Sequence, residues 1–157
     1  MIVTVLPMTP SHPGFGQVAA LFEEYRDQYG QPPSPAATQA WLLEQMVLQR
    51  MSVAAAADDR NHVCGFITTT IVPGSLMLGT VWSVRDLYVA PRYRHAGIAR
   101  QLLEYTINHA RAAGALRVSL QTETDNAPAL ALYTTAGFRP VDGLTLLNLT
   151  LSPNEMT

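Results

Sequence analysis

The stretch Pro91–Arg100 contains residue types suited to binding an anion. It lies between an expected strand end and an expected helix start, where unpaired backbone N–H groups converge and the helix dipole adds partial positive charge. Gly97 lets the backbone approach a ligand closely, and the small side chain of Ala99 leaves room for it. Together these features suit a pyrophosphate. The alternative is an ordinary helix start with solvated arginines, because short glycine motifs alone do not separate the two. The arginines are Arg92, Arg94 and Arg100.

The histidines and the single cysteine give no sign of a metal centre. The four histidines show no paired ligand spacing, and one cysteine supplies none, so no metal site is expected. Cys64 lies in an apolar run and is expected to be a small buried residue rather than a nucleophile. His95 lies inside the anion-binding stretch, where its backbone should matter more than its ring. The remaining histidines are His12, His62 and His109.

Hydrophobic periodicity places these residues on alternating strands and helices. Strands are expected over 2–6, 51–57, 62–72, 80–89 and 116–121, and helices over 15–29, 35–48, 97–113 and 126–136. The unit of strand, helix and strand between 80 and 120 should form a right-handed crossover. Near the end of the chain, alternation predicts a last strand after the hairpin signal Asp142-Gly143. Its apolar residues are Leu147, Leu149 and Leu151.

Length and composition restrict the class of protein. The 157 residues are 48% hydrophobic and 14% charged, which suits one packed domain and excludes disorder. A formal net charge of -2 argues against a nucleic-acid partner, and no apolar run is long enough to cross a bilayer. The single cysteine and an N-terminal segment without signal-peptide features favour a cytoplasmic location. We therefore expect a single α/β domain over residues 1–157.

Two blocks of sequence resemble the signatures of one enzyme superfamily. The run from Asp86 to Ala99, which contains Arg94-(x)2-Gly97-Ile98-Ala99, is similar to motif A of the GNAT N-acetyltransferases. The run Asn126-Ala127-Pro128-Ala129-Leu130-Ala131-Leu132-Tyr133-Thr134-Thr135-Ala136-Gly137-Phe138 is similar to the block that follows the next strand in that superfamily. More narrowly, the segments 25–31 and 85–89 resemble a bacterial branch similar to polyamine/histone and diamine acetyltransferases.

The resemblance implies a fold and a co-substrate. The fold is a mixed sheet of about six to seven strands, splayed between the fourth and fifth, with about four flanking helices. Acetyl-CoA would bind within about residues 80–140, with its pantetheine in the splay beside the backbone of Leu87 and Val89 and its pyrophosphate on the 94–99 backbone. The full set implied is Leu87, Tyr88, Val89, Arg94, His95, Ala96, Gly97, Ile98, Ala99, Arg100, Asn126 and Tyr133.

The resemblance also implies catalytic roles. Tyr133 would protonate the departing thiolate, for which a phenol is acidic enough; its periodicity alone would make it a core aromatic. The base that deprotonates the amine would be Asp86 or Glu123, or a chain of water molecules. Relatives among the diamine enzymes often carry glutamate at the position of Arg85, and arginine cannot be a base here.

An acceptor pocket is expected between the first two helices and the splay. Tyr25, Tyr29 and Trp82 could form an aromatic wall for a cation, with Asp86 nearby, although Tyr25 and Tyr29 equally fit the buried stripe of the first helix. The expected acceptor is a primary amine of a polyamine-like or aminoglycoside-like small molecule. The alternatives are a protein or peptide amine and a non-catalytic acyl-CoA-binding module. A homodimer formed through residues 144–151 is possible.

Overall fold

Residues 1–151 of the computed structural model form one α/β domain built around a five-stranded sheet. The strands are β1 (Val3–Met8), β2 (Ser52–Asp58), β3 (Val63–Pro73), β4 (Thr80–Val89) and β5 (Arg117–Ser119). They are arranged in chain order, with antiparallel pairing from β1 to β4 and parallel pairing between β4 and β5. The expected mixed sheet and its crossover between 80 and 120 are thereby confirmed.

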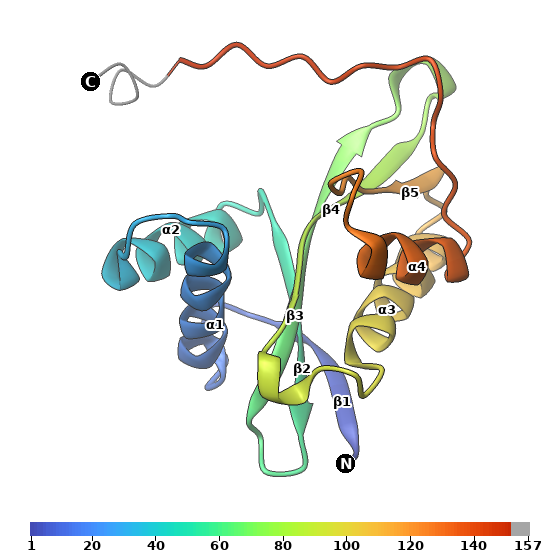
Figure 1. Cartoon of the computed structure of the whole chain (residues 1–157). Helices are drawn as coiled ribbons and strands as arrows, with labels where there is room; N and C mark the ends of the chain where they lie inside the picture. Colours follow the sequence, from blue (N-terminus) through green and yellow to red (C-terminus); the bar gives the residue numbers. More distant parts are fainter. Residues whose placement is uncertain (152–157) are drawn as a thin grey trace.

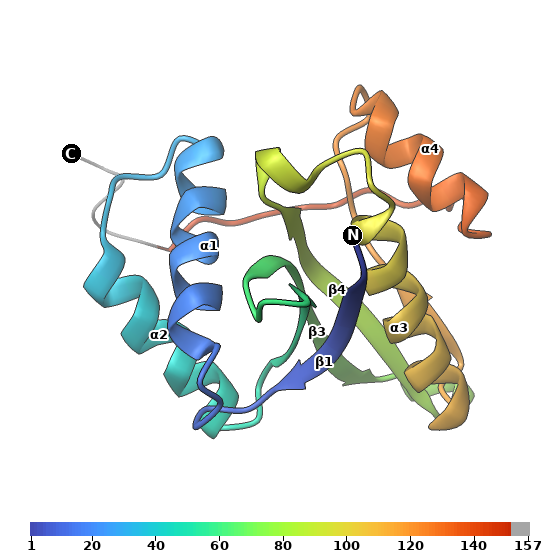
Figure 2. The ribbon, with the colours of Figure 1, turned by 90° about the horizontal axis from the view of Figure 1, so that it is seen from below.

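Four helices cover the two faces of the sheet. α1 (Phe15–Gln28) and α2 (Pro35–Val47) lie on one face, and α3 (Ile98–Ala112) and α4 (Ala127–Thr135) lie on the other (Figures 1 and 2). The ends follow the sequence signals: α1 stops just before Gly30, at a φ of 76°, and α2 begins with Pro35. All four expected helices are therefore present.

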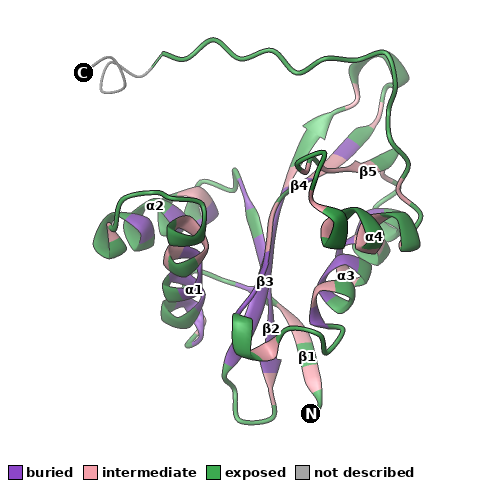
Figure 3. Cartoon of the chain, in the orientation of Figure 1, coloured by how far each residue is buried: buried purple, intermediate pink, exposed green. Residues whose placement is uncertain are grey.

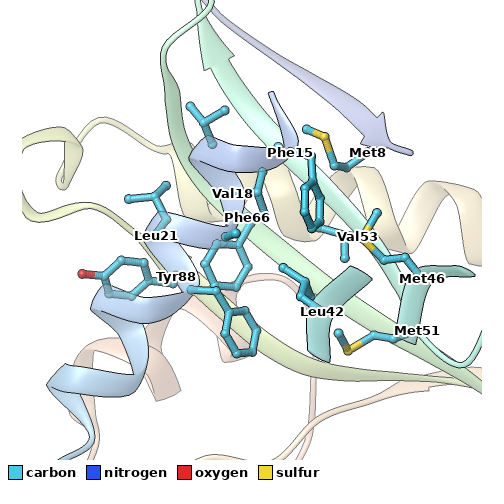
Figure 4. Close-up of a cluster of buried hydrophobic side chains, with 14 of the residues drawn as sticks. Met8, Phe15, Val18, Leu21, Leu42, Met46, Met51, Val53, Phe66 and Tyr88 are labelled. Carbon is cyan, nitrogen blue, oxygen red and sulfur yellow. The ribbon is translucent and has the colours of Figure 1, made fainter. Parts of the chain in front are cut away.

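The core is divided into two layers by the sheet. The layer under α1 and α2 gathers apolar side chains from both helices around Phe66, with Tyr88 at its edge (Figure 4). The other layer packs α3 through Ile98, Leu102 and Leu103. Cys64 is fully buried in this second layer, as expected, and burial raises the pKa of its thiol.

The described sheet has fewer strands than the expected six to seven because the last expected strand does not form. Residues 138–151 contain no helix or strand and extend away from the domain as an arm (Figures 1 and 3). Leu147, Leu149 and Leu151 are each 84% exposed. Alternation makes a segment capable of pairing, but a strand also needs a neighbouring backbone, and the arm has none within the described chain.

Candidate acyl-transfer site

A cleft opens where β4 and β5 separate. The two strands pair only at three positions, from Val81 opposite Arg117 to Ser83 opposite Ser119. Beyond Ser83 they diverge around a cavity of about 810 Å³. β5 is consequently shorter than the expected strand over 116–121, because its last residues line this cleft instead of pairing. The splay implied by the sequence resemblance is present at the expected place.

A β-bulge at Arg85 coincides with the start of the divergence. β4 pairs with β3 through Asp86 opposite Thr68 and Val84 opposite Thr69, which leaves Arg85 as the extra residue. A bulge bends its strand and changes which face the following side chains occupy. Val84 accordingly packs in the layer of α3, whereas Tyr88 packs in the layer of α1. The bulge therefore directs Asp86 toward α1 while the strand turns away from β5.

The backbone of β4 presents polar groups to the cleft. The N–H of Ala90 donates to the carbonyl of Cys64 on β3 over 2.9 Å. Because successive peptide groups of a strand point to opposite sides, the groups of Leu87 and Val89 face away from β3, into the splay. The carbonyl of Val89 accepts a hydrogen bond from Nε of Arg94 over 2.9 Å, which confirms that direction.

Arg94 is held against β4 and α1. Besides its bond to Val89, it donates from Nη2 to Oε1 of Gln28 over 2.9 Å, and its guanidinium lies 5.5 Å from the centre of the Tyr88 ring. The Arg94 side chain therefore joins the wall of the cleft to α1. Arg100 instead pairs with Glu104 one turn along α3, over 2.8 Å.

The start of α3 lies at one end of the cleft. Gly97 caps the helix with a φ of 78°, and His95 has a φ of 64°. A Cβ added at Gly97 would meet no atom within 4 Å, so the space beside its backbone is open. The first-turn N–H groups of a helix have no acceptor inside the helix. This end of the cleft therefore has the partial positive charge and the room for close approach that suit an anion.

Asp86 is the carboxylate in the middle of the cleft. Its Oδ1 accepts a hydrogen bond from the hydroxyl of Tyr25 over 2.9 Å, and its Oδ2 accepts one from the hydroxyl of Thr68. Burial, followed by the charge of Asp86, raises the pKa of Tyr25 well above its ordinary value, so Tyr25 keeps its proton and remains a donor. Each carboxylate oxygen retains a further lone pair for another partner.

Tyr133 on α4 and Glu123, between β5 and α4, line the same cleft as Asp86. Burial raises the pKa of Tyr133, with smaller effects from Tyr29 and Glu123. Asn126 caps α4, because its side chain accepts a hydrogen bond from the N–H of Ala129 over 3.3 Å. Hydrogen bonds from its own backbone N–H and from Asn126 lower the pKa of Glu123, which makes that carboxylate a weaker base.

Most residues expected at the site line this one cleft. Those that do not are Arg92, Ala96 and Trp82. Trp82 pairs on β4 with Ile71 and Val118, before the two strands diverge, so the structure does not bring it together with Tyr25 and Tyr29 in the cleft. Tyr25 combines both roles considered for it, because it lines the cleft and also packs in the core against Phe66, with ring centres 5.9 Å apart.

A second cavity adjoins the first on the side of the first two helices, where an acceptor pocket was expected, but most of its lining residues were missed in the sequence. Its volume is about 290 Å³, and it shares Arg85 and Asp86 with the main cleft. Its other lining residues come from α1, α2, the loop between α2 and β2, and β3, which are separated along the chain. No motif marks them, since nothing local distinguishes them from helix-surface or strand-end residues. They are Phe22, Trp41, Gln45, Arg50, Met51 and Thr70.

Two other kinds of feature, a metal centre and a membrane-spanning helix, are absent from the described residues. Within residues 1–151, no three His, Cys, Asp or Glu side chains are grouped so as to hold a metal ion. In the same part of the chain, no helix is both long and apolar enough to cross a membrane.

Comparison with known proteins gives relatives of one kind. Over 126 residues the chain is 29% identical to the uncharacterized N-acetyltransferase YhfO of Bacillus subtilis, covering 80% of this chain and 84% of that protein. It is 36% identical over 86 residues to a mycothiol acetyltransferase of Kocuria rhizophila, covering 55% of this chain but 28% of that protein. A streptothricin acetyltransferase of Escherichia coli is 31% identical over 86 residues, covering 51% and 49%.

Solved structures and a family model agree with these relatives. The crystal structure of a probable acetyltransferase superposes with a TM-score of 0.86 at 27% identity, covering 97% of this chain and 99% of that one. An aminoglycoside acetyltransferase from an uncultured soil metagenomic sample shares the fold, with a TM-score of 0.79, 18% identity and coverage of 96% and 97%. The model of the acetyltransferase (GNAT) family matches residues 18–138. The chain therefore belongs to the GNAT family of acetyltransferases, which are acyltransferase enzymes that use acetyl-CoA.

Proposed function

We propose that this enzyme transfers an acetyl group from acetyl-CoA to a primary amine of a small molecule, by direct attack in a ternary complex. The observation that carries the proposal is a single cleft that joins a helix start suited to an anion to a carboxylate and a half-buried phenol. These are the N-terminus of α3, Asp86 and Tyr133. An acyl transfer from a pyrophosphate-bearing thioester to an amine needs these three features together.

The cleft suits acetyl-CoA in its shape and its polar groups. A volume of about 810 Å³ lies in the upper range of ligand pockets. The open space beside Gly97 and the free amides of α3 would hold the pyrophosphate. The backbone of Leu87 and Val89, which faces the splay, would pair with the amides of pantetheine as an added strand would. Ala96 is proposed to contribute through its backbone alone.

The reaction needs a proton acceptor, a stabiliser of negative charge and a proton donor. Acetyl-CoA supplies the activated thioester. Asp86, directly or through water, would remove a proton from the ammonium so that the nitrogen can attack. The N–H of Val89 would stabilise the negative charge that develops on the carbonyl oxygen. Tyr133 would protonate the departing sulfur as the carbon–sulfur bond breaks, giving an N-acetyl amine, free CoA and one released proton.

Asp86 is favoured over Glu123 as the base. Asp86 lies where the main cleft meets the second cavity, between the thioester and an amine entering from the side of α1 and α2. Glu123 is exposed, and its lowered pKa makes it a poorer acceptor of a proton at neutral pH. Glu123 remains the alternative if the amine enters from its side of the cleft.

The small-molecule acceptor is supported by the size of the second cavity and by two named relatives. The relatives from Kocuria rhizophila and Escherichia coli are named as acetyltransferases of mycothiol and of streptothricin. Mycothiol and streptothricin are both small molecules. The expected polyamine-like or aminoglycoside-like amines fall within this class. The proposed enzyme is a homodimer, which is supported by the exposed leucines of the C-terminal arm. Its proposed location is the cytoplasm.

Thiol release from acetyl-CoA, followed against a panel of small amines and basic peptides, tests the proposal. We expect release with a small-molecule class and none above background with peptides. Peptide acetylation alone would favour a protein substrate. Stabilisation by acetyl-CoA in a thermal-shift assay, without turnover of any amine, would favour the non-catalytic acyl-CoA-binding module.

A further inference from the structure

The second cavity is the natural place for the acceptor, if the proposed acetyl transfer is correct. It is bounded by α1, α2, β3 and β4, and it meets the acetyl-CoA cleft at Arg85 and Asp86. Its volume of about 290 Å³ is at the lower limit of ligand pockets, which suits a molecule the size of an amino acid and excludes a folded peptide segment. The residues that line this cavity therefore indicate which chemical groups the acceptor carries.

Two arginines give this cavity a positive rim. Arg50 follows α2 and Arg85 is the bulged residue of β4; both are exposed and both line the cavity. The ion pairs within residues 1–151 join Arg26 to Glu23, His62 to Asp58 and Arg100 to Glu104, so neither rim arginine has a carboxylate partner in the described chain.

The one carboxylate of the cavity does not neutralise these arginines. Asp86 uses its oxygens to accept hydrogen bonds from Tyr25 and Thr68. Two guanidinium groups against one carboxylate leave the cavity with a net positive charge. Such a cavity disfavours a polyamine, whose second ammonium would lie beside Arg50 or Arg85.

The arrangement of charges suits a zwitterion. The bulge sets a cation, Arg85, and an anion, Asp86, at adjacent positions of one strand, and both line the same cavity. An ammonium beside Asp86 would place a nearby anionic group within the reach of Arg85 and Arg50. Guanidinium groups bind carboxylates and phosphates through paired N–H donors. Phe22 and Trp41, whose ring centres are 6.0 Å apart, add an apolar wall.

We propose that the acceptor is a small primary amine that also carries an anionic group, with a carboxylate placed as in a free amino acid. Arg50 and Arg85 bind the anionic group, and Asp86 receives the ammonium. The apolar wall formed by Phe22 and Trp41 accommodates the side chain of the acceptor.

The decisive experiment compares matched acceptors with the full-length enzyme. Thiol release from acetyl-CoA is measured with the twenty standard L-amino acids, each as the free acid and as its carboxamide, and with spermidine. O-Phosphoethanolamine and ethanolamine form a further pair that distinguishes a phosphate from a carboxylate. We expect at least one free acid to be acetylated with a kcat/KM roughly 10- to 100-fold above that of its amide, the range for loss of a charged hydrogen bond.

Variants of Arg50 test the assignment without disturbing the acetyl-CoA cleft, which Arg50 does not line. Arg50→Gln should raise the KM for the free acid roughly 10-fold or more while leaving the KM for acetyl-CoA unchanged. Arg50→Glu should reduce the preference for acids further and increase acetylation of spermidine. Arg60→Gln, in the exposed turn between β2 and β3, is the matched control and should change neither KM.

The outcomes separate this inference from the proposed function. Equal or better turnover of amides, ethanolamine or spermidine by the unmodified enzyme would overturn the inference and leave small-amine acetylation standing. Preference for O-phosphoethanolamine over every amino acid would support an anionic group on the acceptor, but it would show that this group is a phosphate and not a carboxylate. Failure to turn over any amine, in an enzyme that acetyl-CoA still stabilises, would overturn both.

Discussion

Tyr133 is a partly buried phenol that keeps its proton throughout the neutral range. Burial raises its pKa, so the protonated form needed to donate to a leaving thiolate persists above pH 10. We predict that Tyr133→Phe lowers kcat roughly 100-fold or more while changing the affinity for acetyl-CoA by less than about twofold. Steady-state thiol release and calorimetric titration with acetyl-CoA measure the two quantities. Equal turnover in the variant would remove Tyr133 from the mechanism.

Asp86 and Glu123 can be distinguished by replacing each carboxylate with its amide. Asp86→Asn keeps the shape of the side chain and can still accept a hydrogen bond from Tyr25 or from Thr68 at its one oxygen, while its NH2 group can donate to the other hydroxyl, but it cannot take a proton. We predict a loss in kcat of roughly 100-fold for Asp86→Asn and a much smaller loss for Glu123→Gln. The reverse order would assign the base to Glu123, and two small losses would favour a chain of water molecules.

Gly97 is needed both for its backbone conformation and for the open space beside it. We predict that Gly97→Glu abolishes acetyl-CoA binding, because it puts bulk and negative charge where the pyrophosphate would lie. Gly114 provides a matched control: it follows the other end of α3, has a φ of 73° against 78° at Gly97, and also has no atom near its missing Cβ. Gly114→Glu should carry the same backbone strain and still bind acetyl-CoA. Loss of binding in both variants would contradict the assignment.

At the scale of elements, Glu23 joins α1 to the start of α2. Its carboxylate accepts hydrogen bonds from the N–H of Ser34 over 2.9 Å and from the hydroxyl of Thr38 over 2.5 Å, and it pairs with Arg26 over 2.9 Å. The Ser34 N–H, then Thr38, lower the pKa of Glu23 below its ordinary value of 4.5. This contact holds together the two helices that form one wall of the second cavity.

The contribution of Glu23 to the stability of the folded protein should decrease as the pH falls. Because the folded-state pKa is lowered, the contribution is fully present above pH 4.5 and is lost as the pH falls through the lowered pKa. We predict that Glu23→Gln lowers Tm at pH 7 and that its difference from the unmodified protein shrinks in acid. Thermal unfolding between pH 3 and 7 measures this. A difference in Tm that stays constant with pH would show that the charge of Glu23 does not contribute.

At the scale of the whole molecule, the C-terminal arm leaves a large apolar surface uncovered. Leu144, Leu147 and Leu149 are exposed by 78%, 84% and 84% (Figure 3). Clusters of exposed apolar side chains often mark a surface that another protein covers. An extended segment with alternating leucines is suited to pairing with the backbone of a second copy, which agrees with the proposed homodimer.

We predict that the protein is a dimer in solution and that Leu147→Ser combined with Leu149→Ser shifts it toward the monomer. Light scattering coupled to size-exclusion chromatography measures the mass directly. Thr145→Ser with Thr150→Ser is a conservative control in the same segment and should leave the dimer intact. A monomeric unmodified protein would refute a role of the arm in dimerisation.

The order of the elements and much of the lining of the main cleft could be predicted from the sequence. α1 to α4 and β1 to β4 were expected close to their observed limits, because periodicity, prolines and glycines act within a few residues. The anion-binding turn at Gly97 is likewise a local feature. The expectation of a last strand within residues 138–151 was wrong. Alternation shows that a segment can form a strand, but it does not show whether a neighbouring strand is present to pair with it.

The sequence by itself determined the helices, most strands, the glycine turn before α3 and the place of Tyr133 on α4, since each depends on neighbours along the chain. Only the tertiary structure decided which groups surround the acceptor. Tyr25 reaches Asp86 across 61 residues of sequence, and Arg50 joins Arg85 around one cavity. Both depend on the bulge at Arg85, because one extra residue in a strand reverses the faces of the side chains that follow. No local pattern encodes that combination of register and packing.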